Sequence, residues 1–167
     1  FSDMAESNGA DLRFSTPGGE LLEYEIERWI DGSSLAEVWV RVPVVQGSDD
    51  TQYITMHWGQ SGLSSASSPE NVFDTASGFE GVWHLDETSG SAMDATANSH
   101  DGTYTGTSFP SQADGVIGKG QDFEYGNSNY IDIPDESSFD YTGNMTVSLW
   151  MKVENPWDVN WQALISK

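Results

Sequence analysis

The stretch LLEYEIERW, residues 21–29, alternates apolar and acidic side chains and decides the fold class of its region. In a β-strand, successive side chains point to opposite faces of the sheet, so this alternation is typical of a half-buried strand. We expect Leu22, Tyr24 and Ile26 to join a core. The glutamates between them would then form a solvated face.

The same pattern recurs along the chain and predicts an all-β protein. Further strands are predicted over residues 11–16, 36–45, 51–59, 79–87, 118–125, 129–135, 145–153 and 161–167. Within residues 145–153, Trp150 alternates with Val147 and Leu149 and is expected to be packed. No apolar i, i+3, i+4, i+7 pattern persists for three helical turns. Residues 60–70, QSGLSSASSPE, are rich in small and hydroxyl side chains and are typical of a linker between domains.

Acidic residues far outnumber basic ones, which narrows the range of partners. The 167 residues include 27 Asp and Glu against 6 Lys and Arg, a formal net charge of -21. Nucleic acid and anionic membrane surfaces would be repelled, whereas cations and neutral polar ligands would not. The chain has no cysteine for disulfides or thiolate metal sites. Its apolar runs are too short for membrane insertion, and a first residue other than methionine suggests a processed piece of a longer protein.

One family resemblance is carried by four segments in the first third of the chain. These are GADLRF (9–14), LLEYEIERW (21–29), AEVWVRVP (36–43) and TQYITMHWG (51–59). Together they resemble a bacterial surface domain of unassigned function, which occurs in modular extracytoplasmic proteins and beside biopolymer-transport proton channels. The resemblance covers residues 1–60 and implies a small β-sandwich-like module. Because the family's domain begins with further strands, it also implies an incomplete copy here.

A second resemblance covers residues 79–167. Its segments are GVWHLDETSGSAMDATANSHDGTYTG (81–106), GVIGKGQDFEYGNSNYIDIPD (115–135) and NMTVSLWMKV (144–153). They resemble the laminin-G and concanavalin-A-like lectin superfamily, in the variant common in bacterial adhesins and polysaccharide-degrading enzymes. The resemblance stops about halfway through the family's antiparallel β-sandwich or jelly roll, and it implies glycan binding, often with calcium. The expected organisation is a small β module over 1–60, a linker over 61–78 and a partial lectin-like domain over 79–167.

The loop MDATANSHDG, residues 93–102, offers oxygen ligands for a hard cation. Asp94, Asn98 and Asp101 fall in a stretch of eight residues inside this Gly-containing loop. Calcium takes carboxylate and amide oxygens from such loops. The alternative is that these side chains bond their own backbone in ordinary turns. The lectin-like resemblance makes calcium as strong a prediction as the turns.

Two aromatic groups are candidates for glycan binding, because rings stack on sugars while amides bond hydroxyls. The first group is Tyr125, Asn127, Asn129 and Tyr130. Its alternative role is a hairpin turn around Gly126 and Asn127. The second group is the pair Trp157 and Trp161, which is a stacking platform if exposed and part of a core if buried.

Catalysis is not predicted. β-Jelly-roll endoglucanases carry a similar alternating acidic strand, in which one carboxylate attacks the sugar and another donates the proton. That arrangement needs the strand in the concave sheet of a full jelly roll, whereas residues 21–29 lie in the module without lectin character. His57, His84 and His100 are scattered, and the sequence shows neither a nucleophile motif nor clustered histidine ligands for zinc.

The sequence therefore predicts a non-catalytic extracellular or cell-surface module of a larger protein, which binds a glycan or surface glycoconjugate or serves adhesion. The alternative is a structural or assembly element, such as a surface-fibre segment or an extracytoplasmic accessory domain of a proton-channel complex. A jelly-roll glycosidase is a third interpretation. Half a sandwich would expose an apolar face and an unpaired strand edge, so we expect missing sequence or another chain to complete the fold.

Overall fold

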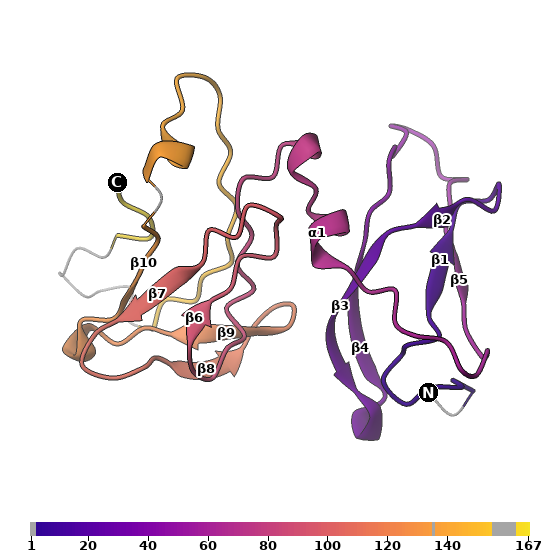
Figure 1. The fold of residues 1–167 in the computed structure, drawn as a ribbon, viewed down its shortest axis with the longest axis horizontal. Helices are drawn as coiled ribbons and strands as arrows, with labels where there is room; N and C mark the ends of the chain where they lie inside the picture. Colours follow the sequence, from indigo (N-terminus) through magenta and orange to yellow (C-terminus); the bar gives the residue numbers. More distant parts are fainter. Residues whose placement is uncertain (1–2, 135, 155–162) are drawn as a thin grey trace.

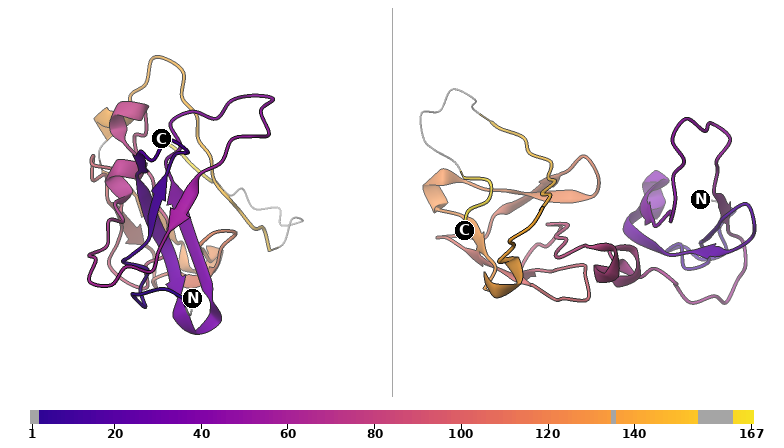
Figure 2. Two further views of the ribbon diagram at one scale, coloured as in Figure 1. Left: turned by 90° about the vertical axis from the view of Figure 1, so that its right-hand side faces the viewer. Right: turned by 90° about the horizontal axis from the view of Figure 1, so that it is seen from above.

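The protein has two lobes joined by a short helical segment (Figure 1). Its structure is a computed structural model that describes residues 3–134, 136–154 and 163–167. The N-terminal lobe comprises residues 3–59, and the C-terminal lobe comprises the described residues from 79 onward. Seen from above, the helical part of the connecting segment (residues 60–78) lies between the two lobes (Figure 2).

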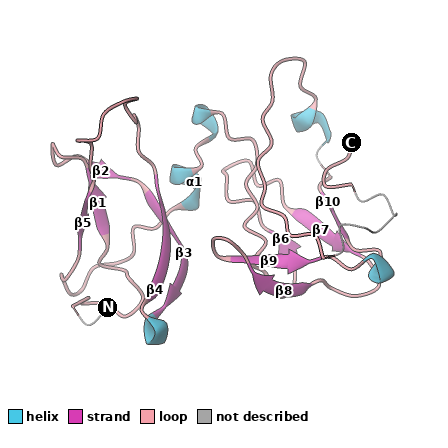
Figure 3. Ribbon diagram, turned by 180° about the vertical axis from the view of Figure 1, so that it is seen from behind, coloured by secondary structure: helices cyan, strands magenta, loops and turns pink. Residues whose placement is uncertain are grey.

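The described elements are mostly strands, in agreement with the predicted all-β class (Figure 3). Residues 79–87, also predicted to form a strand, contain only an isolated bridge between Trp83 and Asp94. The N-terminal lobe contains β1 (Arg13–Ser15), β2 (Leu21–Leu22), β3 (Tyr24–Ile30), the 3-10 turn η1 (Asp31–Ser33), β4 (Leu35–Val40) and β5 (Thr55–His57). The connecting segment contains α1 (Pro69–Val72) and η2 (Thr75–Ser77). The C-terminal lobe contains β6 (Ser91–Ala92), β7 (Gly102–Thr105), β8 (Ser111–Asp114), β9 (Lys119–Asp122), η3 (Tyr125–Asn127), β10 (Tyr130–Asp132) and η4 (Glu136–Phe139). In the part of the chain that the structure describes, no helix is long and apolar enough to cross a bilayer.

Two antiparallel sheets enclose the core of the N-terminal lobe. One has the strand order β2-β1-β5, and the other is the β3–β4 hairpin. The buried cluster between them consists of Leu12, Phe14, Leu22 and Tyr24. The Tyr24 ring meets Phe14 edge-on with centroids 5.3 Å apart, and its hydroxyl donates to Leu12 O at 2.8 Å. Ile26 packs against this cluster, so the prediction that Leu22, Tyr24 and Ile26 face a core is confirmed.

A β-bulge in β3 changes which side chains face the core after Ile26. The pairing of β3 with β4 is regular up to Ile26 and then shifts, so that Arg28 lies opposite Glu37. Glu27 is the extra residue at this shift, and a bulge of this kind re-aims a side chain relative to simple alternation. As a result Arg28 reaches Asp114 of the C-terminal lobe and Trp29 lines the apolar side of the hairpin, while Glu25 and Glu27, on one face by simple alternation, both reach His84.

The C-terminal lobe has a smaller interior. Its sheets are β10-β7-β6 and the separate β8–β9 hairpin. Ala92 of β6 is fully buried. Gly102 of β7 lies directly beneath Ile131 of β10, and a Cβ at Gly102 would collide with that side chain. Close approach at a glycine therefore lets β10 pack on β7 over a small apolar centre.

Residues 145–153, predicted to form a strand, belong to no strand. Trp150 is 77% exposed, and Val147 and Leu149 are exposed as well. A strand needs a neighbour that satisfies its backbone hydrogen bonds, and this segment pairs with none of the described strands. The expected packing of Trp150 is therefore wrong, and the four sheets of the described residues do not combine into a jelly roll.

The connecting segment lies against the β3–β4 hairpin. Ser68 N donates to Tyr24 O at 2.8 Å, which places the chain alongside the edge of β3. Arg41, just after β4, pairs with Asp74 at 2.9 Å. These contacts attach residues 60–78 to the N-terminal lobe, while the division of the chain into domains stays a prediction.

Candidate functional site

The junction between the lobes brings together a histidine and two glutamates that are far apart in the sequence. Glu25 and Glu27 project from β3, and His84 lies in the segment that enters the C-terminal lobe. His84 Nδ1 lies 2.7 Å from Glu27 Oε2, and His84 Nε2 lies 3.2 Å from Glu25 Oε2. We call these three residues the junction cluster, in which an imidazole is held between two carboxylates.

The junction cluster is largely shielded from water. The side chains of Glu25, Glu27 and His84 are 10%, 3% and 18% exposed. The Phe73 ring lies against His84 with centroids 5.6 Å apart. Trp39 Nε1 donates to Glu27 Oε2 at 2.9 Å. Because water is mostly excluded, the charges in the cluster act on one another more strongly than they would at an open surface.

These surroundings favour the charged forms of the cluster. Burial lowers the pKa of His84, but the contacts with Glu25 and Glu27 outweigh burial and raise this pKa to about 10. Burial raises the pKa of Glu27, but hydrogen bonds from His84 and Trp39 outweigh it and leave this pKa below its ordinary value. At neutral pH the cluster therefore holds a histidinium ion between carboxylates.

A second ion pair extends the junction toward the β8–β9 hairpin. Arg28 Nε lies 2.7 Å from Glu37 Oε2, directly across the β3–β4 hairpin. Arg28 Nη1 lies 3.6 Å from Asp114 Oδ1 at the end of β8. Gly118 N, in the β8–β9 loop, donates to Glu37 Oε2 at 2.8 Å. The hairpin of one lobe is therefore docked on the hairpin of the other.

Gly118 allows this close approach. Its φ is +63°, in the left-handed region that favours glycine. A Cβ at this position would collide with Glu27 Oε1. The loop between β8 and β9 therefore needs a glycine where it meets the junction cluster.

The acidic face of β3 differs from the solvated surface that its alternation predicts. Glu23 is exposed, as expected, and accepts a hydrogen bond from Asn71 Nδ2 at 3.1 Å. Glu25 is only 8% exposed, and Glu27 is covered by the C-terminal lobe. A period of two separates the faces of a strand but does not show whether water or a second lobe covers each face. The prediction of a solvated face is wrong for Glu25 and Glu27.

A known protein family matches the part of the chain that forms this junction. A family described as a domain of unknown function, DUF2341, matches residues 8–97. The chain belongs to this family. The DUF2341 region contains β1–β5, the connecting segment and the whole junction cluster. It agrees with the resemblance to a surface domain of unassigned function and continues beyond residue 60, through the residues that contact β3 and β4.

Beyond the DUF2341 family, no individual relative of the chain is found. No curated protein and no solved structure matches the chain. Nothing found supports a laminin-G or concanavalin-A-like domain over residues 79–167. The family therefore provides a boundary for the shared unit but no ligand or activity.

The predicted calcium loop uses its oxygens for internal hydrogen bonds. The Asp94 carboxylate accepts hydrogen bonds of 2.8–3.0 Å from Val82 N, Thr96 N, Thr96 Oγ1 and His100 N. Asp101 Oδ1 accepts from Asp94 N at 2.9 Å, and Asn98 Nδ2 donates to Glu80 O at 3.0 Å. These are the bonds of ordered turns, so the geometry favours the turn interpretation. Calcium binding by Asp94, Asn98 and Asp101 stays a prediction.

The first group of predicted sugar-binding residues forms a turn with two exposed rings. Tyr125 and Asn127 lie in η3, and Tyr130 begins β10. Asn129 Oδ1 accepts from Glu124 N at 3.2 Å and helps to hold the turn. Tyr125 and Tyr130 are 71% and 54% exposed. The amides of Asn127 and Asn129 thus form hydrogen bonds within the protein, while the two rings remain exposed.

The second group, Trp157 and Trp161, lies outside the described residues. Its role as a stacking platform stays a prediction. The nearest described tryptophan in the sequence is Trp150, which is exposed on a segment without a strand partner.

A serine and a histidine also meet in the N-terminal lobe. Ser15 Oγ lies 2.9 Å from His57 Nε2 across the antiparallel pair of β1 and β5. Ser15 is only 4% exposed, so a substrate would not reach its hydroxyl. We interpret this contact as a cross-strand hydrogen bond that stabilises the sheet.

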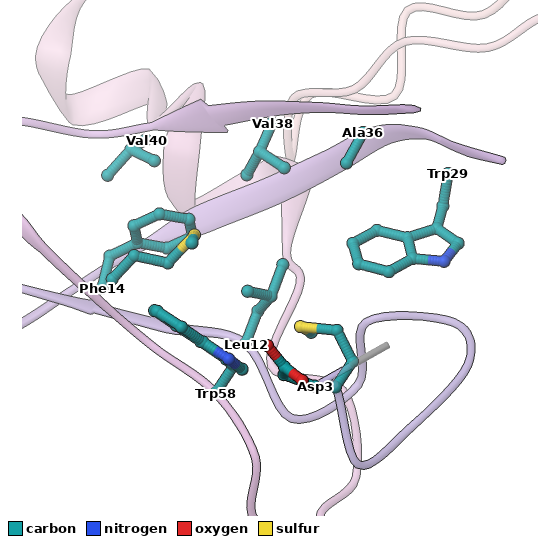
Figure 4. Close-up of a pocket in the computed structure, with 10 residues that line it drawn as sticks. Asp3, Leu12, Phe14, Trp29, Ala36, Val38, Val40 and Trp58 are labelled. Carbon is teal, nitrogen blue, oxygen red and sulfur yellow. The ribbon is translucent and has the colours of Figure 1, made fainter. Parts of the chain in front are cut away.

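An apolar groove opens between the two sheets of the N-terminal lobe (Figure 4). Its volume is ≈ 470 Å³. It is lined by Asp3, Met4, Leu12, Phe14, Trp29, Ala36, Val38, Val40, Met56 and Trp58. Figure 4 shows Trp29 and Trp58 on opposite sides of the groove. Asp3 is the one charged residue among the described lining, so the groove suits an apolar group better than the hydroxyls of a sugar.

The junction cluster is the functional candidate that sequence reasoning missed. Its carboxylates come from one strand, and its imidazole comes from a segment beyond the connecting residues. Metal and ion-pair motifs are found in a sequence when their residues share a short spacing, and these do not. No feature of the sequence distinguishes His84 from His57 and His100.

Proposed function

We propose that this chain is a non-catalytic binding module of a larger extracellular or cell-surface protein, and that its ligand is a glycan or surface glycoconjugate. The observation that carries the proposal is the exposed pair Tyr125 and Tyr130 beside a hydrogen-bonded turn. Aromatic rings on an ordered support stack on the apolar face of sugars. The lectin-like character of residues 79–167 is part of this proposal and rests on their sequence resemblance.

The charge of the protein supports the choice of ligand. With a net charge of -21, the chain would repel nucleic acid and anionic membrane surfaces. A neutral saccharide would not be repelled by this charge. The proposal therefore includes a neutral or weakly charged glycan and excludes nucleic acid and membrane insertion as modes of binding.

The state of the β3 glutamates supports a role without catalysis. A glycosidase places two carboxyl groups on either side of an accessible glycosidic bond. Glu25 and Glu27 instead contact the same imidazole and lie beneath the C-terminal lobe. Activity on a broad polysaccharide panel that disappears in Glu27→Gln would contradict this part of the proposal.

A glycan array tests the binding role directly. We expect the chain to retain at least one saccharide, and the double variant Tyr125→Ala, Tyr130→Ala to lose at least tenfold in affinity, since each stacked ring contributes on the order of 1 kcal/mol. Tyr53→Ala is a matched control, because Tyr53 is 62% exposed but lies in the other lobe. Failure to retain any saccharide would refute the glycan proposal.

Calcium is the proposed cofactor of the loop that contains Asp94, Asn98 and Asp101. A thermal melt with and without millimolar calcium, after exhaustive chelation, tests it. A ligand that binds only the folded state raises the melting midpoint by mass action. An unchanged midpoint would remove calcium from the proposal and leave glycan binding to the array.

A structural or assembly role is the second candidate, and the exposed segment 145–153 favours it. Val147, Leu149, Trp150 and Met151 are all exposed there, and exposed apolar stretches of this kind often mark protein contacts. The partner would be another chain that completes the second lobe, as in a surface fibre or a proton-channel assembly. Sedimentation velocity over a range of concentrations tests this candidate: self-association that Leu149→Ser abolishes would favour it, and a monomer throughout would exclude self-assembly.

A further inference from the structure

We propose that the junction cluster is a binding site for a divalent first-row metal ion, with Glu25 Oε2 and His84 Nε2 as ligands and Glu27 as the residue that orients the imidazole. One donor atom from each of the three residues lies within 4.8 Å of those of the other two. Mixed imidazole and carboxylate ligands are typical of zinc and related ions. This inference is independent of the glycan proposal, which concerns the exposed rings of Tyr125 and Tyr130.

Two buried polar atoms of the cluster face each other without a hydrogen bond. Glu25 Oε2 and His84 Nε2 are inaccessible to water and form an ion pair at 3.2 Å, but they are not aligned as a hydrogen bond. Buried polar atoms nearly always have an aligned hydrogen-bond partner, and the misaligned contact leaves both atoms placed to share a cation. Two ligands at zinc distances in a tetrahedral shell are separated by about 3.3 Å. The observed spacing therefore matches one edge of such a shell.

The remaining nitrogen of the imidazole is held as it is in known metal sites. A histidine that binds a metal commonly donates its other N–H to a carboxylate, which fixes the tautomer and the ring orientation. His84 Nδ1 lies 2.7 Å from Glu27 Oε2, and Trp39 Nε1 holds the same oxygen from a second direction at 2.9 Å. Glu27 therefore presents His84 Nε2 toward Glu25.

The charges of the cluster also suit a cation. Two carboxylates face one imidazole, so a divalent ion bound to the neutral ring would balance both negative charges. On binding, the ion takes the position on Nε2, and any proton on that nitrogen passes to solvent, because a ligating imidazole nitrogen is unprotonated.

A second group of acidic side chains is a useful contrast. Asp122, Glu124 and Glu154 also bring carboxylate oxygens within 4.8 Å of one another. That group is wholly acidic and lies at the surface, with Glu124 and Glu154 exposed. We assign no function to it and use it as an internal control.

The first test uses the unmodified chain. The protein is chelated and then titrated with ZnCl₂ while the ring nitrogens of ¹⁵N-labelled histidine are followed by NMR. The chain has three histidines, so each ring can be resolved. We expect the His84 resonances to shift and saturate at one equivalent while those of His57 and His100 stay in place. An unchanged His84, or shifts centred on the other two rings, would overturn the proposal.

The second test compares variants by calorimetric titration with ZnCl₂. Glu25→Gln should weaken binding at least 100-fold, and Glu27→Gln about 10- to 100-fold, as expected for a ligand and for its orienting partner. Glu124→Gln is the matched control and should bind as the wild type does. Loss of binding in Glu124→Gln with binding kept in Glu25→Gln would place the ion elsewhere and refute the proposal. If Glu25→Gln does not fold, the NMR titration of the wild type decides.

Discussion

The two lobes differ in what they bury. In the N-terminal lobe, Leu12, Phe14, Leu22 and Tyr24 form a closed cluster in which each residue is at most 7% exposed. In the C-terminal lobe, the buried residues include the small Ala92 and Thr96, whereas large apolar residues such as Trp150 remain exposed. The first lobe therefore closes a core from its own strands. The described part of the second lobe does not.

Two stretches with the same alternation show the reason. Residues 21–29 contain most of β3, which pairs with β4 after a single 3-10 turn. Residues 145–153 alternate in the same way, yet they pair with no described strand. Alternation gives a segment one apolar face that can be buried, but a strand forms only where a neighbouring strand satisfies its backbone hydrogen bonds.

Truncation in the first core should have the largest effect. Phe14→Ala is expected to lower the free energy of unfolding by about 4 kcal/mol, because it removes a buried ring and leaves a cavity. Trp150→Ala should change it by less than about 0.5 kcal/mol, because that ring is 77% exposed. Urea denaturation measures both. Similar losses in the two variants would break the comparison between the lobes.

The next largest effect should come from the junction cluster. Glu27→Gln is expected to lower the free energy of unfolding of the metal-free protein by about 3 kcal/mol, because it removes one partner of a buried ion pair. Glu23→Gln makes the same substitution on the exposed part of the strand and should cost less than about 0.5 kcal/mol. Thermal denaturation at fixed pH measures the pair, and equal effects would mean that the lobes do not dock as described.

Acid sensitivity should also differ between the lobes, because Asp11 anchors the first one. Its carboxylate is buried and accepts from Gly59 N at 2.7 Å and Ala5 N at 3.0 Å. Burial raises the pKa of Asp11, but these backbone donors outweigh burial and lower it below the ordinary value of 3.8. The stabilisation is therefore complete above about pH 4 and is lost as the pH falls through the lower pKa of the folded state.

The matching variant is Asp11→Asn. It should cost about 2 kcal/mol at pH 7, through weaker hydrogen bonds to an uncharged acceptor. The difference from the wild type should shrink below about pH 4, as Asp11 becomes protonated in both states. Denaturation curves at several pH values measure this trend, and a difference that stays constant down to about pH 2 would contradict it.

The smallest of these effects concerns the β8–β9 loop, which contacts the N-terminal lobe. Gly118→Ala should cost about 1.5 kcal/mol, because alanine disfavours a φ of +63° and its Cβ would meet Glu27. Gly120→Ala lies in the same hairpin with no atom near its Cβ position, so its effect should be under about 0.5 kcal/mol. Thermal melts of both variants measure the difference. A larger loss of stability in Gly120→Ala would mean that the hairpin contacts the N-terminal lobe at a residue other than Gly118.

Local pattern predicted the first lobe better than the second. The positions of Leu22, Tyr24 and Ile26 follow from a period of two. Strands β1 and β5 lie within predicted segments, and β4 overlaps the segment predicted over residues 36–45. Strands β6, β7 and β8 lie in polar, glycine-containing segments where no apolar alternation is visible. Their side chains need little burial, so their pairing is decided by long-range contacts rather than by local composition.

The candidate site was less predictable than the fold. Exposure of Tyr125 follows from its place in a polar turn, but the junction cluster depends on the docking of two lobes. A bulge shifts one side chain out of simple alternation, and nothing in residues 21–29 marks its position. The link between Glu27 and His84 is tertiary, which local pattern does not encode.

Residue-resolved hydrogen exchange on the whole chain tests the contrast between the lobes most directly. Amides in strands over a closed core exchange only through large openings, whereas unpaired segments exchange almost freely. We predict the slowest exchange in β1, β3 and β4 and nearly unprotected amides over residues 145–153. Protection of residues 145–153 equal to that of β3 in the monomer would mean that the second lobe closes a core of its own, and would contradict the contrast between the lobes.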